Sequence, residues 1–181
     1  MTVTDIARDS VIAALEQGKV ESHLHPSGSY DLADHSAPTG REEIWRFTPL
    51  KRLKGLADDA VFHPSTTEIT FTTPDGVRVE RVTGEEARGL RGISGYKPST
   101  LFGARVLADV AETLLVDVPA EAEIADPVFI DLFGSDASNT EAGHVALRFG
   151  NFSKAVVVLR HTGSAALAQV VEISVGDGAQ V

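Results

Sequence analysis

Residues 113–181 constrain the fold of this chain most strongly, because they hold a series of short apolar runs with no helical pattern between them. Turns rich in Gly, Asp, Asn and Ser separate runs rich in Val, Leu and Ile, which are 114–118, 128–132, 144–149, 155–160 and 168–175. A string of strands without intervening helices predicts a β-sandwich, a barrel or a β-solenoid.

An internal repeat favours the solenoid among these three architectures. Residues 150–155 (Gly-Asn-Phe-Ser-Lys-Ala) are echoed 26 residues later by residues 176–181 (Gly-Asp-Gly-Ala-Gln-Val), and each copy follows a β-type run. Residues 119–124 form a weaker third copy. A period of this length is typical of one rung of a solenoid, in which each rung stacks on the next.

The N-terminal part of the chain carries helical signals instead. A stripe of apolar residues predicts a helix over 5–17, and a stretch rich in Ser, His and Asp predicts a loop over 21–38. Thr39 and Glu42 fit a capping box, which predicts the start of a second helix. Pro49 ends that helix and begins a shorter one.

Alternation of apolar and polar residues then replaces the helical period. The turn Thr73-Pro74-Asp75-Gly76 joins two alternating runs and predicts a β-hairpin over 67–82. The stretch 99–111 predicts a helix that begins at a Ser cap. We therefore divide the chain into an N-terminal helical and α+β region, 1–112, and the beginning of a β-solenoid, 113–181.

Composition excludes several classes of function. The 181 residues include no Cys, which excludes disulfides, Cys-ligated zinc, Cys-ligated iron–sulfur clusters and thiol catalysis by this chain. A net charge of −10 disfavours nucleic acid as a partner, because phosphates are repelled. The chain shows no apolar run of about 18 residues and no signal-peptide pattern, so we expect a cytoplasmic protein with no membrane partner.

Three aspartates are the candidates for catalysis. Asp126, Asp131 and Asp136 supply enough carboxylates for the acid pair of a glycosidase, a reaction found on some β-solenoids. Their sequence contexts are, however, those of a turn, a strand and a loop. We therefore expect no catalytic residue in this chain.

Six histidines are the candidates for metal binding. His23 and His25, with His35 ten residues further on, could be metal ligands, and the first two lie on one side of the chain if their segment is extended, but no carboxylate pattern accompanies them. His63, His144 and His161 are isolated, and we expect ordinary strand or turn histidines there. The sequence therefore predicts no metal site and no cofactor bound by this chain.

Charge is distributed unevenly along the sequence. Residues 106–147 hold nine acids and no Lys or Arg. Residues 41–54 hold a basic cluster, interrupted by Pro49, that consists of Arg41, Arg46, Lys51, Arg52 and Lys54. We expect a docking or packing arm here rather than a membrane or nucleic-acid helix, with these apolar side chains buried: Trp45, Phe47, Leu50 and Leu53.

Two segments carry a resemblance to a known family. Residues 39–53 (Thr-Gly-Arg-Glu-Glu-Ile-Trp-Arg-Phe-Thr-Pro-Leu-Lys-Arg-Leu) resemble the E-x-W-[RK]-[FY]-T-x-L segment of SufD-type members of the SufB/SufD family of iron–sulfur cluster assembly proteins. Residues 161–179 resemble the family's H-x-G … N-V-E-I-x-V-G-D-G-A pattern, except that Val170 stands where the family often has Asn. Val118-Pro119 and Asp126-Pro127-Val128 lie where the family enters its β-helix.

The resemblance implies a mainly β fold, in which an N-terminal helical arm and a small α/β region precede the first rungs of a right-handed parallel β-helix, a single-stranded β-solenoid. It also implies a non-catalytic scaffold subunit of the SUF complex, with SufB-like and SufC-like (ATPase) partners and an iron–sulfur cluster held in the full complex. The family's functional histidine and its main partner contacts lie beyond the matched part, so the resemblance transfers no functional residue.

Because family members are longer, we expect this chain to be a truncated N-terminal portion. The strand at 171–175 then lies at an open edge, which predicts self-association. Two other functions stay open: a β-solenoid carbohydrate-active enzyme using Asp126, Asp131 or Asp136, and a stand-alone protein-interaction module. The arm at 39–53 favours the scaffold, because a generic solenoid has no reason to carry it.

Overall fold

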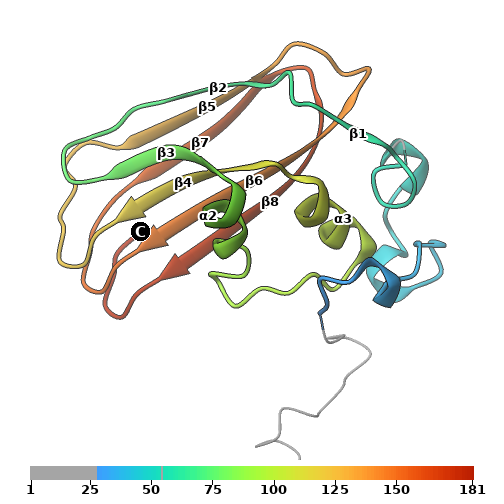
Figure 1. Cartoon of the computed structure of the whole chain (residues 1–181), viewed down its shortest axis with the longest axis horizontal. Helices are drawn as coiled ribbons and strands as arrows, with labels where there is room; N and C mark the ends of the chain where they lie inside the picture. Colours follow the sequence, from blue (N-terminus) through green and yellow to red (C-terminus); the bar gives the residue numbers. More distant parts are fainter. Residues whose placement is uncertain (1–27, 54) are drawn as a thin grey trace, which may run out of the picture.

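The computed structural model describes residues 28–53 and 55–181, whose strands form two sheets (Figure 1). The helical elements are η1 (Leu32–Asp34), η2 (Glu43–Trp45) and η3 (Leu50–Leu53), which are 3-10 turns, and α2 (Gly84–Gly89) and α3 (Leu101–Asp109). The strands are β1 (Phe62–His63), β2 (Glu68–Phe71), β3 (Arg78–Thr83), β4 (Glu112–Val118), β5 (Val128–Gly134), β6 (Thr140–Phe149), β7 (Val157–Gly163) and β8 (Ala166–Val175). The helix predicted over 5–17 lies outside the described residues, as do His23 and His25.

The two sheets are mixed, and the chain passes repeatedly from one to the other. In the larger sheet, β4 and β8 lie on opposite sides of β6 and parallel to it, β3 adds to β4 in the antiparallel direction, and β1 pairs with the first residues of β6. In the smaller sheet, β5 pairs with β7 in parallel and with β2 in antiparallel. From β4 to β8, successive strands therefore alternate between the two sheets.

The sequence repeat corresponds to backbone stacking in space. The N–H of Phe152 donates to the carbonyl of Asp177, and the N–H of Glu121 donates to the carbonyl of Asn151, each at 2.8 Å. Stacked side chains are 31 residues apart between β4 and β6, 29 between β5 and β7, and 26 beside the turn after β6. All five strands predicted in this region are present.

The main core lies between the two sheets. Inward-facing side chains of β4, β5 and β6 are almost fully buried there and form one cluster, which includes Leu114, Val116, Val118, Val128, Ile130, Leu132, Val145, Leu147 and Phe149. Burying each such side chain contributes about 1.5–3 kcal/mol, so this cluster is the largest source of stability in the fold.

A second, smaller core covers the outer face of the larger sheet. Leu115 of β4 and Ala146 of β6 point away from the main core and pack against Ala87 of α2 and Leu90 after it. Helix α3 packs on β6 and β8 on the same side, as Figure 1 shows. The Thr100 hydroxyl caps α3 by accepting from the N–H of Gly103 at 3.3 Å, one residue later than the predicted Ser cap.

The predicted hairpin over 67–82 is wrong, although both strands and the turn exist. Ile69 of β2 pairs with Leu132 in the smaller sheet, whereas Val79 of β3 pairs with Val116 in the larger sheet. The turn therefore carries the chain between sheets. Alternation shows which face of a strand is apolar but not which strand lies beside it, and here β4 and β5 supply buried partners on both sides of the core.

The predicted helix at Thr39 is also replaced by a shorter element. The Glu42 carboxylate accepts from the backbone N–H of Thr39 at 3.0 Å, as a capping box requires, but only the 3-10 turn η2 follows. The expected burial of the arm is found only in part: Phe47 is 87% exposed, whereas Trp45, Leu50 and Leu53 are half-buried. A 3-10 turn of three or four residues offers too little apolar face to pack fully against the sheets.

Candidate functional site

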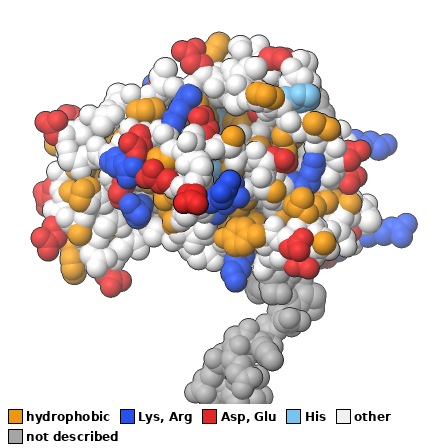
Figure 2. Space-filling view, viewed as in Figure 1, with side chains coloured by type: hydrophobic (Ala, Val, Ile, Leu, Met, Phe, Trp, Pro, Cys, Tyr) orange, Lys and Arg blue, Asp and Glu red, His pale blue; other side chains and the backbone are white. Residues whose placement is uncertain are grey.

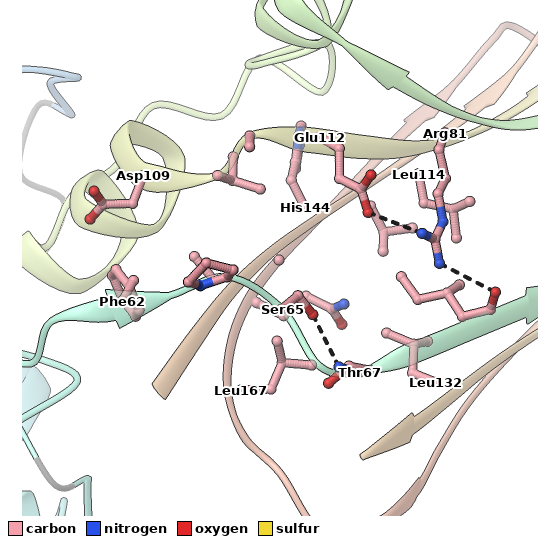
Figure 3. Close-up of a pocket in the computed structure, with 18 of the residues that line it drawn as sticks. Phe62, Ser65, Thr67, Arg81, Asp109, Glu112, Leu114, Leu132, His144 and Leu167 are labelled. Atoms are coloured by element: carbon pink, nitrogen blue, oxygen red, sulfur yellow. Dashed lines mark hydrogen bonds and ion pairs between the residues drawn. The ribbon is translucent and has the colours of Figure 1, made fainter. Parts of the chain in front are cut away.

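A cavity of about 610 Å³ opens at one end of the two sheets (Figure 3). It lies beside the part of β6 that neither β1 nor β4 pairs with. β1 pairs with β6 at Thr140 and Glu141, and β4 pairs with β6 from Val145 onward. Residues 142–144 of β6 line the cavity between these two pairings. The strand arrangement itself therefore creates the opening.

The deep part of the cavity is aliphatic and its mouth is charged. Leu114, Leu132 and Leu167 line the interior. At the mouth, Arg81 of β3 lies beside Glu112 of β4, with 3.5 Å between Nη1 and Oε1. The Nη2 of Arg81 also donates to the carbonyl of Ile69 on β2 at 3.4 Å, so this side chain spans from the larger sheet to the smaller one.

A buried carboxylate fixes one wall of the cavity. Glu141 of β6 is fully buried and accepts hydrogen bonds from the hydroxyls of Ser65, Thr66 and Thr67 and from the backbone N–H of Thr66 at 2.8 Å. Burial acts to raise the pKa of Glu141, but these donors outweigh it and lower the pKa to about 2. The segment between β1 and β2 is therefore held to β6 by an ionised side chain.

A second buried polar network lies behind the opposite wall. The Nδ1 of His144 is 2.9 Å from the Thr113 hydroxyl, and its Nε2 is 3.2 Å from Oε1 of Glu172. Glu172 also accepts from the N–H of Gly92 and the hydroxyl of Ser94, each at 2.8 Å. Burial lowers the pKa of His144 more than Glu172 raises it, so the imidazole is neutral near pH 7.

The hydroxyl, imidazole and carboxylate of this network occur in the order found in nucleophilic enzymes. The Thr113 side chain is, however, fully buried and does not line the cavity, so its oxygen faces no space for a substrate. Nδ1 of the neutral imidazole faces the Thr113 hydroxyl and Nε2 faces the Glu172 carboxyl group, so both ring nitrogens have a partner. The network thus fastens the segment after α2 to the larger sheet.

The three candidate aspartates are not brought together at this cavity or elsewhere. Asp131 and Arg160 form a two-pronged ion pair, and the hydrogen bond from Arg160 lowers the pKa of Asp131. Asp136 accepts from the hydroxyl of Ser138, which lowers its pKa too. Asp126 precedes β5 and is exposed.

Their spacing also disagrees with a glycosidase. The extended strand β5, Val128–Gly134, spans roughly 20 Å and separates Asp126 from Asp136, whereas the paired carboxyl groups of a glycosidase lie within about 10 Å of one another. The catalytic acid of such a pair needs a raised pKa, and the shifts at Asp131 and Asp136 are in the opposite direction. The geometry therefore gives the carbohydrate-active alternative no support.

The sequence did not predict the roles of Glu141, His144 and Glu172. His144 was expected to be an isolated strand histidine, and it proves to be the centre of the buried network. The available signal was a charged residue inside an apolar run, as at Glu172 between Val171 and Ile173. The partners of such a residue come from segments distant in the sequence, which no local pattern reveals.

The other described histidines do not belong to a buried network. The Nε2 of His35 lies 2.9 Å from the carbonyl oxygen of Ser29, and the Nε2 of the exposed His161 lies 2.9 Å from Oε1 of Gln169. His63 lines the cavity. Within residues 28–53 and 55–181, no group of three or more His, Asp or Glu side chains is placed to hold a metal ion. In the same part of the chain, no helix has the length and apolar character needed to cross a membrane.

The arm forms a separate basic surface away from the cavity. Ile44 and Phe47 are exposed beside the cations Arg41, Arg46, Lys51 and Arg52. Figure 2 shows basic side chains projecting from the end of the molecule that carries the arm. The guanidinium of Arg46 lies 5.5 Å from the centre of the Phe47 ring, within range of a cation–π contact.

Known proteins similar to this chain are found among curated sequences. It is 33% identical over 173 residues to an iron–sulfur cluster assembly SufBD family protein of Mycobacterium leprae, which covers 95% of this chain and 42% of the relative. It is 32% identical over 167 residues to proteins of the same description from Mycobacterium bovis and Mycobacterium tuberculosis, covering 90% of this chain and 41% of each relative.

No family model and no solved structure matches the chain. The alignment with the curated relatives nevertheless includes both the arm motif and the stacked strands, since it extends over nearly the whole chain. The chain spans about two fifths of the length of these relatives. On this evidence of sequence, the chain belongs to the SufBD family.

Proposed function

We propose that this chain is the N-terminal portion of a SufD-like, non-catalytic scaffold subunit that takes part in iron–sulfur cluster assembly. One observation carries the proposal: over 95% of its length the chain aligns with a relative described as an iron–sulfur cluster assembly protein. The absence of Cys fits a division of labour in which a partner subunit supplies thiolate ligands for the cluster. The partners are then SufB-like and SufC-like proteins, the latter an ATPase.

Strands β4 to β8 are, in this proposal, the first rungs of a right-handed parallel β-helix. Their alternation between two sheets and their parallel stacking support it. Isolated parallel bridges from Glu123 to Lys154 and from Lys154 to Gln180 add a short third side to each rung. A rigid stack of this kind suits a scaffold, because its surfaces are held by backbone hydrogen bonds.

The apolar side of β8 is the surface on which a further rung would stack. Val171, Ile173 and Val175 are 39%, 50% and 52% exposed, although they continue the rows of the buried Val145, Leu147 and Phe149 of β6. Such a strand edge is a template for another chain. The 181-residue chain alone is therefore expected to self-associate, and light scattering that shows a monomer at high concentration would contradict this.

The scaffold role is tested with the full-length gene product. It is co-expressed with the SufB-like and SufC-like proteins of the same organism, and the purified assembly is weighed by light scattering after gel filtration. We expect a stoichiometric complex, together with reduced activity of iron–sulfur enzymes when the gene is deleted. A full-length protein that forms no complex, and whose deletion leaves those enzymes fully active, would refute the proposal.

A further inference from the structure

The cavity beside Arg81 has the size of a ligand site and is not used by the proposed scaffold role. Its volume of about 610 Å³ falls within the range of roughly 300–1,000 Å³ typical of small-molecule sites. Its interior is made by aliphatic side chains from both sheets, among them Leu114, Leu132 and Leu167. Such a lining favours an aliphatic group, which gains by leaving water.

The walls of the cavity are held in place without a ligand. Glu141 fixes residues 65–67 on one side, and the His144–Glu172 network fixes β6 to β8 behind the other. Neither network has a free buried atom directed into the cavity. A ligand therefore enters a formed site and orders little of the chain, which removes a major cost of binding.

The mouth carries charges of both signs. Arg81 contacts Glu112 at 3.5 Å and the Ile69 carbonyl at 3.4 Å, both longer than the roughly 2.7–2.9 Å of a strong charge-assisted hydrogen bond. Its guanidinium can therefore make a shorter, better contact with an incoming anion. Asp109, at the end of α3, also lines the cavity, but Figure 3 shows it at the opposite end from Arg81 and Glu112.

These charges select among aliphatic ligands. A simple carboxylate would satisfy Arg81 but would face Glu112, which repels it. A simple amine would pair with Glu112 but would be repelled by Arg81. A molecule that carries both groups on neighbouring atoms satisfies Arg81 and Glu112 together, and the short separation between these two side chains fits that arrangement.

We propose that the cavity binds an aliphatic α-amino acid. Its carboxylate pairs with Arg81, its ammonium group lies at Glu112, and its side chain occupies space between Leu114, Leu132 and Leu167. The volume leaves room for long or branched aliphatic side chains, such as those of leucine and norleucine.

The first test uses the unaltered 181-residue chain and isothermal titration calorimetry. Leucine is expected to bind saturably. Leucinamide, which lacks the carboxylate, and N-acetylleucine, which lacks the ammonium group, are each expected to bind about tenfold or more weakly, the cost of losing one charged hydrogen bond. Absence of leucine binding would overturn the proposal, and so would binding of either blocked form as tight as that of leucine.

The second test locates the site with variants. Arg81→Met is expected to weaken leucine binding about tenfold or more. Arg148→Met is the matched control, because Arg148 is also a strand arginine paired with an acid, Asp117, but lies outside the cavity. Leu167→Phe narrows the space for the side chain of the ligand without removing a charge and is expected to weaken binding.

Circular dichroism melts establish that each variant is folded before its binding is measured. Unchanged leucine binding in both folded cavity variants would overturn the proposal. If Arg81→Met does not fold, the comparison of leucine with its two blocked forms on the unaltered chain still decides the outcome.

Discussion

Replacing Glu141 by Gln removes a buried charge while keeping the shape of the side chain. The carboxylate accepts from three hydroxyls and from backbone N–H groups, and Thr66 N and Ser65 Oγ are both 2.8 Å away. A Gln side chain has only one acceptor oxygen, and its NH₂ group faces donors. The segment between β1 and β2 would then lose much of its attachment to β6.

The size of the effect follows from the pKa of Glu141. The fall from the ordinary pKa of 4.5 to about 2 corresponds to about 3 kcal/mol of folding free energy at neutral pH, since each pKa unit is worth about 1.4 kcal/mol. Because the pKa is lower in the folded state, this stability is fully present above pH 4.5. It is lost as the pH falls through the folded value near 2.

Urea unfolding followed by circular dichroism measures this directly. Glu141→Gln is expected to be about 3 kcal/mol less stable than the unaltered chain at pH 7, and the difference is expected to shrink steadily below pH 4.5. Glu68→Gln is the control, because Glu68 is an exposed carboxylate on the adjacent β2 and its loss should change stability by less than about 0.5 kcal/mol. A difference under 1 kcal/mol at pH 7, or one that does not vary with pH, would refute the reasoning.

Three further predictions concern other parts of the molecule. The lowered pKa of His144 predicts that stability declines as the pH falls below about 6.5, and that His144→Gln removes this part of the decline in urea unfolding. Gly176→Ala should cost about 1–3 kcal/mol in the same assay, because the added carbon would lie 2.6 Å from the backbone nitrogen of Asn151. Asp131→Asn should leave the midpoint of urea unfolding nearly unchanged, since its ion pair with Arg160 is exposed, and a loss of stability as large as that of Glu141→Gln would contradict this.

The sequence allowed the stacked strands to be located because their signals are local. Each strand from β4 to β8 is an apolar run bounded by turn residues, and the repeat at Gly150 and Gly176 marks equivalent turns. The partners of β2 and β3 could not be predicted in the same way. Pairing depends on which distant strand offers a buried face, and the turn between β2 and β3 is compatible with a hairpin or with a crossing between sheets.

The cavity escaped prediction for a related reason. It exists because β1 and β4 leave residues 142–144 of β6 between them, and the two strands are separated by almost fifty residues of sequence. Arg81 and Glu112 are ordinary charged residues in their own segments. Only the register of β3 on β4, in which Arg81 lies opposite Leu114 and Thr83 opposite Glu112, places them at the same opening.

The unequal spacing of stacked residues has a consequence for how the chain tolerates change in length. The connection between β5 and β6 spans residues 135–139, whereas β7 and β8 are joined by residues 164–165 alone, after Gly163 in a left-handed conformation with φ of 76°. Extra residues therefore accumulate at a corner of the stack and leave the hydrogen-bonded strands in register. A peptide epitope or fluorophore inserted at Ser138 should report on assembly without disturbing the fold. The same insertion at Ser164 should prevent the chain from folding.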